Sequence, residues 1–74
     1  MKRSTKTYDL KNGYGIECIT IENEFYGTKW FQIDVVMLCV PWKEVVESYS
    51  NIKSKEQANE VYQRLAKKYK ALVV

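Results

Sequence analysis

The chain has 74 residues, of which 46% are hydrophobic and 28% are charged. This composition is ordinary for a globular protein and argues against global disorder. The length allows one domain, spanning residues 1–74, and a folded chain of this size buries only about 60% of the surface that its unfolded form exposes. Ten aromatic side chains help so small a core, because each can bury a large area.

Several classes of protein are excluded at this stage. No stretch approaches the ~20 apolar residues of a membrane-spanning helix, and no apolar run follows the basic start at 1–4. We therefore expect a cytoplasmic protein without membrane association. The sequence has no histidine and only two cysteines, Cys18 and Cys39, too few ligands for a structural zinc site. We expect no metal or cofactor and two buried free thiols, with a disulfide as the alternative.

The first half of the sequence predicts a hairpin. A flexible basic tail at 1–5 leads into a first strand at Thr5–Leu10. Asn12-Gly13 is typical of a type I′ turn, which needs positive φ at both central residues. The second strand follows at Ile16–Glu22, where β-branched residues predominate.

Residues 29–40 give the clearest strand pattern. One alternating set of side chains is uniformly apolar: Phe31, Ile33, Val35, Met37 and Cys39. The other set is polar in the middle and apolar toward its end: Trp30, Gln32, Asp34, Val36, Leu38 and Val40. Pro41 ends or bends the strand because it lacks a backbone N–H.

The segment 42–52 has two interpretations. Apolar residues at Trp42, Val45, Val46 and Tyr49 fit one face of a helix that begins at Pro41. The same segment also fits a fourth strand at 44–52, since valine and tyrosine favour β structure. We favour the strand, because the helix that follows has its own distinct start.

The last element is an amphipathic helix over 55–70. Ser54 with Gln57 three residues later is typical of an N-terminal capping box. An apolar stripe recurs at helical spacing along Ala58, Val61, Tyr62, Leu65, Tyr69 and Leu72. The predicted fold is therefore α+β: a three- to four-stranded antiparallel meander over 6–52 with one C-terminal helix, 54–70, on one face.

The sequence contains few of the residues and motifs that enzymatic catalysis commonly uses. No histidine can act as a base near neutral pH, neither cysteine has a histidine partner, and no glycine-rich phosphate loop is present. Asp34 is the one charged residue inside the apolar strand. We expect it on the wetter sheet face or paired with a lysine such as Lys29 or Lys43. The sequence thus indicates a non-enzymatic protein with no evident small-molecule substrate.

A protein-binding role follows from the number of apolar faces. One helix of 16 residues is about 24 Å long and covers only one side of the predicted sheet. The other side displays five apolar residues that we expect to bind a partner, either a second copy in a homodimer or a larger protein: Trp30, Val36, Leu38, Val40 and Trp42. The alternative is that sheet twist and the segment 42–52 cover these residues.

Nucleic-acid binding is the second hypothesis. The stretch Ser54-Lys55-Glu56-Gln57-Ala58 and the strand-then-helix order resemble the arm-binding domains of phage integrases, which implies a sheet that enters the major groove. However, residues 12–52 carry a net charge of −4, whereas 1–11 carry +3 and 53–74 carry +4. Any such binding would therefore use the basic ends: Lys2, Arg3, Lys6, Lys67, Lys68 and Lys70.

Overall fold

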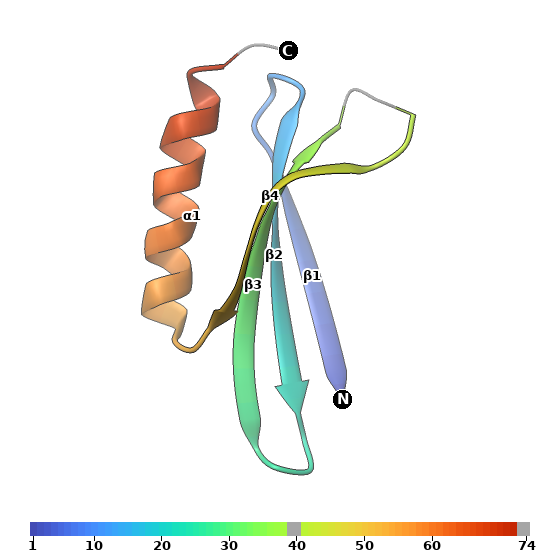
Figure 1. Cartoon of the computed structure of the whole chain (residues 1–74), viewed down its shortest axis with the longest axis vertical. Helices are drawn as coiled ribbons and strands as arrows, with labels where there is room; N and C mark the ends of the chain where they lie inside the picture. The colour runs from blue at the N-terminus through green and yellow to red at the C-terminus, as the bar shows by residue number, and fades with distance from the viewer. Residues whose placement is uncertain (39–40, 73–74) are drawn as a thin grey trace.

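The predicted α+β meander is confirmed. The computed structural model describes residues 1–38 and 41–72. Four antiparallel strands pair in the order β1-β2-β3-β4, and one helix packs on the sheet (Figure 1). The elements are β1 (Lys2–Asp9), β2 (Tyr14–Asn23), β3 (Thr28–Met37), β4 (Glu44–Ile52) and α1 (Lys55–Lys70).

The flexible tail predicted at 1–5 is wrong, because residues 2–5 belong to β1. Lys2 pairs with Glu22 at one end of the ladder and Asp9 pairs with Gly15 at the other. Every residue of β1 is exposed. An edge strand that buries no side chain has no apolar alternation, so its sequence resembles that of a tail. Its backbone hydrogen bonds to β2 hold it in the sheet.

The β1–β2 hairpin is confirmed, but its turn is not of type I′. Positive φ occurs at Lys11 (67°) and Gly13 (92°) but not at Asn12, whereas a type I′ turn needs it at both Asn12 and Gly13. The Leu10 backbone N–H donates to the Tyr14 carbonyl at 3.0 Å, which closes a longer loop. The Asn12 side chain leaves this loop and donates to the carbonyls of Tyr69 and Leu72 at the end of α1.

Residues 44–52 form a strand, as predicted. The β3–β4 ladder has two irregularities, between Phe31 and Ile33 and between Val35 and Val36. Asn51 near the end of β4 has a φ of 58°, in the left-handed region that asparagine tolerates better than most residues. The register resumes with Ile52 opposite Phe31, where Ile52 is buried in the core.

The helix begins and ends where the sequence predicted. The Gln57 backbone N–H donates to Ser54 Oγ at 3.1 Å, so Ser54 is the N-cap. The core lies between α1 and the sheet and contains Ile16, Ile33, Val35, Ile52, Leu65, Ala66 and Tyr69. Ala66 was missing from the predicted stripe, and Leu72 of that stripe is 43% exposed. Among the described residues, no helix is long and apolar enough to cross a membrane.

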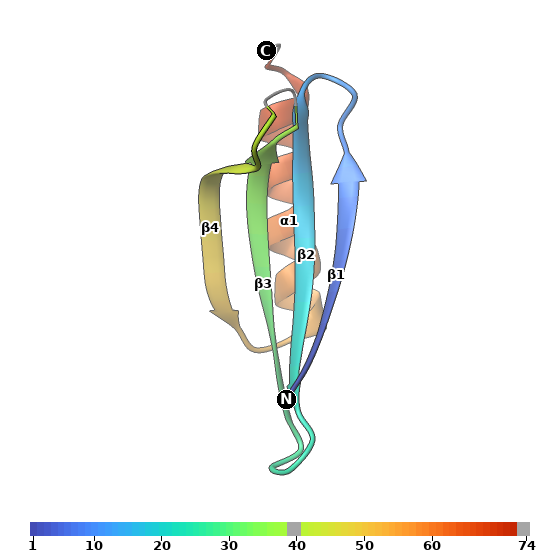
Figure 2. The same ribbon diagram turned by 90° about the vertical axis from the view of Figure 1, so that its right-hand side faces the viewer.

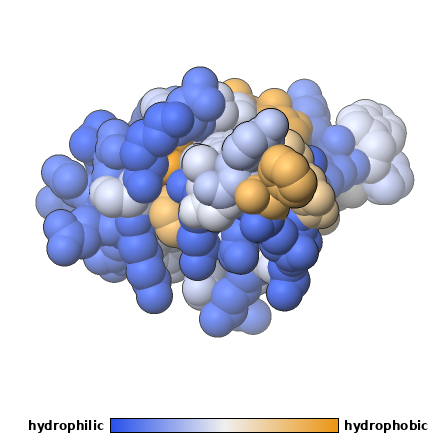
Figure 3. Space-filling model, turned by 90° about the horizontal axis from the view of Figure 1, so that it is seen from below, coloured by the Kyte–Doolittle hydropathy of each residue, from blue (hydrophilic) through white to orange (hydrophobic). Residues whose placement is uncertain are grey.

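The molecule is elongated, with extents of 42 × 26 × 15 Å. Helix α1 lies behind the sheet in Figure 2, so the opposite side of the sheet, here called the open face, points toward the viewer. The β2–β3 hairpin extends beyond the start of α1 (Figure 1). Phe25 and Tyr26 at its turn are 87% and 74% exposed, and hydrophobic groups stand among hydrophilic ones on this end of the molecule (Figure 3).

Candidate functional site

The open face carries the alternating residues of β3 that begin with Trp30. Because Ile33 and Val35 pack against the helix, Trp30, Asp34 and Val36 point to the opposite side of the sheet. Leu38 belongs to the same side, since its Cδ1 lies only 2.7 Å from the position that a Cβ on Gly15 would take. Gly15 is the residue opposite Val36 in the β2–β3 ladder.

The five residues predicted to bind a partner do not form one patch. Val36 is only 1% exposed, so the prediction that its side chain is displayed is wrong. Leu38 and Trp42 are 41% and 65% exposed and lie at the same end of the face. Trp30 is half-buried and stands opposite Ile21, about 20 Å along β3 from Val36. Val40 lies outside the described residues.

Val36 is buried because residues that follow β3 return over the open face. They enclose a groove of about 310 Å³. Its lining comes from β1, β2, β3 and the β3–β4 connection: Thr7, Glu17, Val36, Met37, Leu38, Pro41, Trp42 and Lys43. On β4, Val45 pairs with Val36 and is 49% exposed, which extends the apolar surface beside the groove.

Glu17 is the feature of this groove that the sequence analysis missed. The residue is 6% exposed, and its Oε2 forms an ion pair with Lys43 Nζ at 2.5 Å. Within residues 1–38 and 41–72, Glu17 Oε1 is buried and has no hydrogen-bond partner. An unpaired buried oxygen is costly, so such an atom calls for a ligand or a water. A charged residue in a strand rich in isoleucine is the signal that could have identified it.

Asp34 lies directly opposite Glu17 in the β2–β3 ladder and is also buried. Gln32 Nε2 donates to both of its carboxylate oxygens, at 3.1 and 3.2 Å, and Ser48 Oγ donates at 2.6 Å. Asp34 therefore lies on the side of the sheet away from the helix, as predicted, but it is buried there rather than wet. The predicted Lys43 is not its partner, because Lys43 binds Glu17 instead. Two carboxylates and one ammonium leave this part of the face with one net negative charge.

The basic residues of the alternative hypothesis lie in separate places. Lys2 and Lys6 pair with Glu22 and Cys18 and point to the helix side of the sheet, whereas Arg3 points to the open face. The chain's N-terminus and the end of α1 lie at opposite ends of the long axis (Figure 1). Lys67, Lys68 and Lys70 are therefore remote from Lys2 and Arg3 at the start of β1, and Lys68 is paired with Glu47 at 3.1 Å.

The metal-binding potential of the described residues is low, since none of their Cys, Asp and Glu side chains gather in groups of three or more. Cys18 is a free thiol, and Cys39 lies outside the described residues. Comparison with protein-family models, with curated proteins and with solved structures found no match. Only the geometry of this chain therefore indicates what it does.

Proposed function

We propose that this chain is a non-enzymatic protein-interaction module that forms a homodimer through the open face. The observation that carries the proposal is Glu17 Oε1, a buried acceptor without a partner among the described residues. It lies in a groove beside the exposed side chains of Leu38 and Trp42. Exposed apolar side chains around a polar group that needs a partner are typical of protein interfaces, where tryptophan often contributes most of the affinity.

The open face also carries a suitable donor for this acceptor. Arg3 lies on the same side of the sheet as Glu17 and is exposed, and it forms no ion pair within the part of the chain that the structure describes. A guanidinium group is the usual partner of a carboxylate at an interface, because it offers several N–H donors in a fixed geometry. One face thus holds both halves of an ion pair, as a symmetric dimer requires.

The spacing along β2 allows the two copies to pair in this way. Glu17 and Ile21 lie two residues on either side of Ile19, and Ile21 is the neighbour of Arg3 in the β1–β2 ladder. A two-fold axis that crosses the strands at Ile19 places Glu17 of one copy over Ile21 of the other. Arg3 of that copy is then one strand away, about 4.8 Å, within reach of an arginine side chain.

The same symmetry brings apolar groups together at both ends of the interface. The end of one copy that carries Leu38 and Trp42 meets the β2–β3 hairpin of the other. Exposed aromatic rings lie there, at Phe25 and Tyr26. The Asn23 side-chain oxygen accepts from the backbone N–H groups of both residues, at 3.1 and 3.3 Å, and so fixes the turn that presents them.

Sedimentation at micromolar concentration tests the proposal. We expect the wild type to sediment as a dimer, and Arg3→Glu and Glu17→Lys each to sediment as a monomer because like charges then face one another. An equimolar mixture of the two variants should recover a dimer, since each then supplies the charge that the other lacks. Lys2→Glu is the matched control: it makes the same charge change one residue away, on the helix side of the sheet.

Leu38→Lys gives an independent test at the apolar end of the face. This variant should keep its circular dichroism spectrum and lose the dimer, because Leu38 is 41% exposed in the single chain. A wild type that remains monomeric would overturn the proposed homodimer. A dimer that withstands both Arg3→Glu and Leu38→Lys would show that self-association uses another surface.

A further inference from the structure

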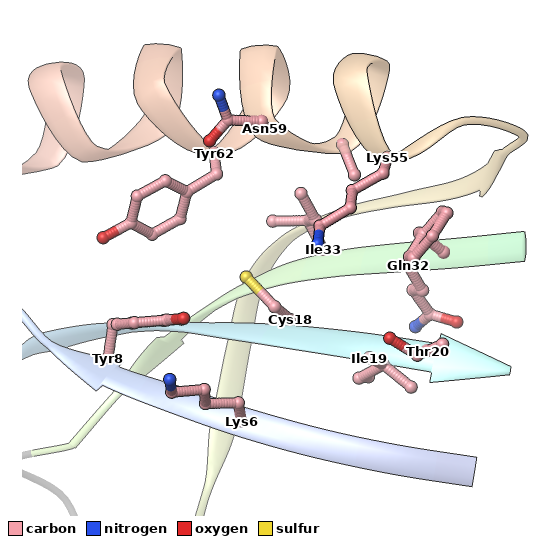
Figure 4. Close-up of a pocket in the computed structure, with 12 residues that line it drawn as sticks. Lys6, Tyr8, Cys18, Ile19, Thr20, Gln32, Ile33, Lys55, Asn59 and Tyr62 are labelled. Atoms are coloured by element: carbon pink, nitrogen blue, oxygen red, sulfur yellow. The ribbon is translucent and has the colours of Figure 1, made fainter.

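A second groove lies on the other side of the sheet, between β1–β3 and the first half of α1 (Figure 4). Its volume is about 330 Å³, within the range of sites that hold small molecules. It is lined by Lys6, Tyr8, Cys18, Ile19, Thr20, Phe31, Gln32, Ile33, Lys55, Ala58, Asn59 and Tyr62. The groove exists because α1 packs on β2, β3 and β4 and leaves β1 uncovered beyond the contact of Tyr8 with Tyr62.

The walls of this groove are largely apolar. The rings of Tyr8 and Tyr62 lie 5.1 Å apart, and Ala58 on the helix is too small to fill the space below it. The Cys18 side chain points from β2 toward the helix (Figure 4). Burial raises the pKa of the Cys18 thiol, and the positive charge of Lys6 partly opposes that rise. The interior of the groove therefore disfavours a charged group, while the positive charge of Lys6 acts at its edge.

Two lysines flank the groove, and none of the described residues that line it is acidic. Lys6 comes from β1 and Lys55 from the first residue of α1, so they approach from opposite sides (Figure 4). Within the described residues neither lysine forms an ion pair. The start of α1 adds the positive end of the helix dipole. Unpaired cations at the edge of an apolar groove complement a ligand with one negative charge and a hydrocarbon body.

We propose that this groove binds an amphipathic monocarboxylate, with its carboxylate between Lys6 and Lys55 and its hydrocarbon body against Tyr8, Tyr62 and Phe31. Asn59, one helical turn after Lys55, supplies a further hydrogen-bond donor at the groove. This site is independent of the homodimer, because it lies on the helix side of the sheet. The Leu38→Lys variant, altered only on the open face, should therefore bind the same ligand equally well.

Titration of decanoate into the isotope-labelled full chain, followed by two-dimensional NMR, tests the site. We expect saturable shifts at Cys18, Ala58 and Asn59, with a dissociation constant of roughly 0.1–1 mM for a ligand of this size. Decanol, which lacks the charge, and decylammonium, which reverses it, should each bind about tenfold more weakly or not at all. Equal affinity for decanol would overturn the role of the lysines.

Variants locate the binding more sharply. Lys6→Gln with Lys55→Gln should weaken decanoate about tenfold, whereas Lys67→Gln, an exposed lysine in the last turn of α1, should not change it. Ala58→Phe should fill the groove and abolish binding while the helix remains. In a Cys39→Ser background, decanoate should slow alkylation of Cys18.

Several results would reject the proposal. Unchanged affinity in the Lys6 and Lys55 double variant, or in Ala58→Phe, would place the ligand elsewhere. The absence of saturable shifts up to the aggregation limit of decanoate would show that the groove does not bind this class. If a short single-stranded oligonucleotide shifted the same resonances while decanoate did not, the lysines would be assigned to phosphate recognition instead.

Discussion

Tyr69, in the last turn of α1, donates a hydrogen bond from its hydroxyl group to Glu47 Oε2 on β4. Glu47 also accepts from Tyr49 at 2.8 Å and from Lys68 at 3.1 Å. These donors lower the pKa of Glu47 to about 2, with the Tyr69 bond as the largest cause. The pKa of Tyr69 rises to about 12, through burial first and its bond to Glu47 second. This contact ties the end of the helix to an edge strand.

Removal of the Tyr69 hydroxyl should therefore weaken the attachment of α1 to β4. We expect Tyr69→Phe to reduce the free energy of unfolding by about 1–2 kcal/mol, because the ring remains in the core while a hydrogen bond to a charged group is lost. Urea denaturation measures the change. Tyr49→Phe is the matched control: Tyr49 is 40% exposed, and water can replace its bond, so its loss should lower stability much less. Equal effects of the two variants would contradict this account.

Acid should destabilise the fold through Glu47. Because the folded-state pKa is about 2 and the ordinary value is 4.5, this carboxylate stabilises the folded state at pH values above 4.5. The contribution is lost as the pH falls from 4.5 to 2, since the unfolded chain binds the proton first. Thermal unfolding across this range measures the effect. Glu47→Gln should be less stable than the wild type at pH 7 and should lose less stability on acidification. Parallel pH curves for the two proteins would refute the assignment.

Asn12 should stabilise the last turn of α1 although it lies in the β1–β2 loop. Its Nδ2 donates to the Tyr69 carbonyl at 2.6 Å and to the Leu72 carbonyl, and its Oδ1 accepts from the Tyr14 N–H at 3.2 Å. The last carbonyls of a helix lack intrahelical partners, so these bonds cap it from outside. Asn12→Ala should cost about 1–2 kcal/mol. Faster amide hydrogen exchange confined to the last turn of α1 would identify the cause; protection equal to that of the wild type would exclude it.

Gly15 should affect the open face more than the fold. A Cβ at this position would lie 2.7 Å from Leu38 Cδ1 and 3.3 Å from the Tyr8 carbonyl oxygen. The exposed Leu38 side chain can turn away, so Gly15→Ala should cost about 1 kcal/mol or less while it weakens self-association. Gly27→Ala is the control: its φ of +68° disfavours alanine, but no atom lies within 4 Å. It should lower stability by about 1 kcal/mol through the backbone alone, without the side-chain contact that Gly15→Ala creates. If Gly15→Ala dimerised as strongly as the wild type, Leu38 would not be part of the interface.

Some expectations from the sequence concern local structure, and these are the ones that the structure confirms most fully. Residues 55–70 form the predicted helix because Ser54 caps it and its apolar residues recur at helical spacing. Phe31, Ile33 and Val35 face the helix because strand side chains alternate. Only the second half of β1 was predicted as a strand. An edge strand that is exposed on both sides has no apolar alternation by which its first half could be recognised.

The sequence by itself determined the α+β class and the helix and favoured the strand at 44–52, because these depend on residues close together in the chain. Only the tertiary structure decided the features that carry the proposals. Lys43 reaches Glu17 across 26 positions, Lys68 reaches Glu47 across 21, and Lys6 and Lys55 line the same groove. Burial of a charge and its choice of partner are set by the packing of distant segments, which no local pattern encodes.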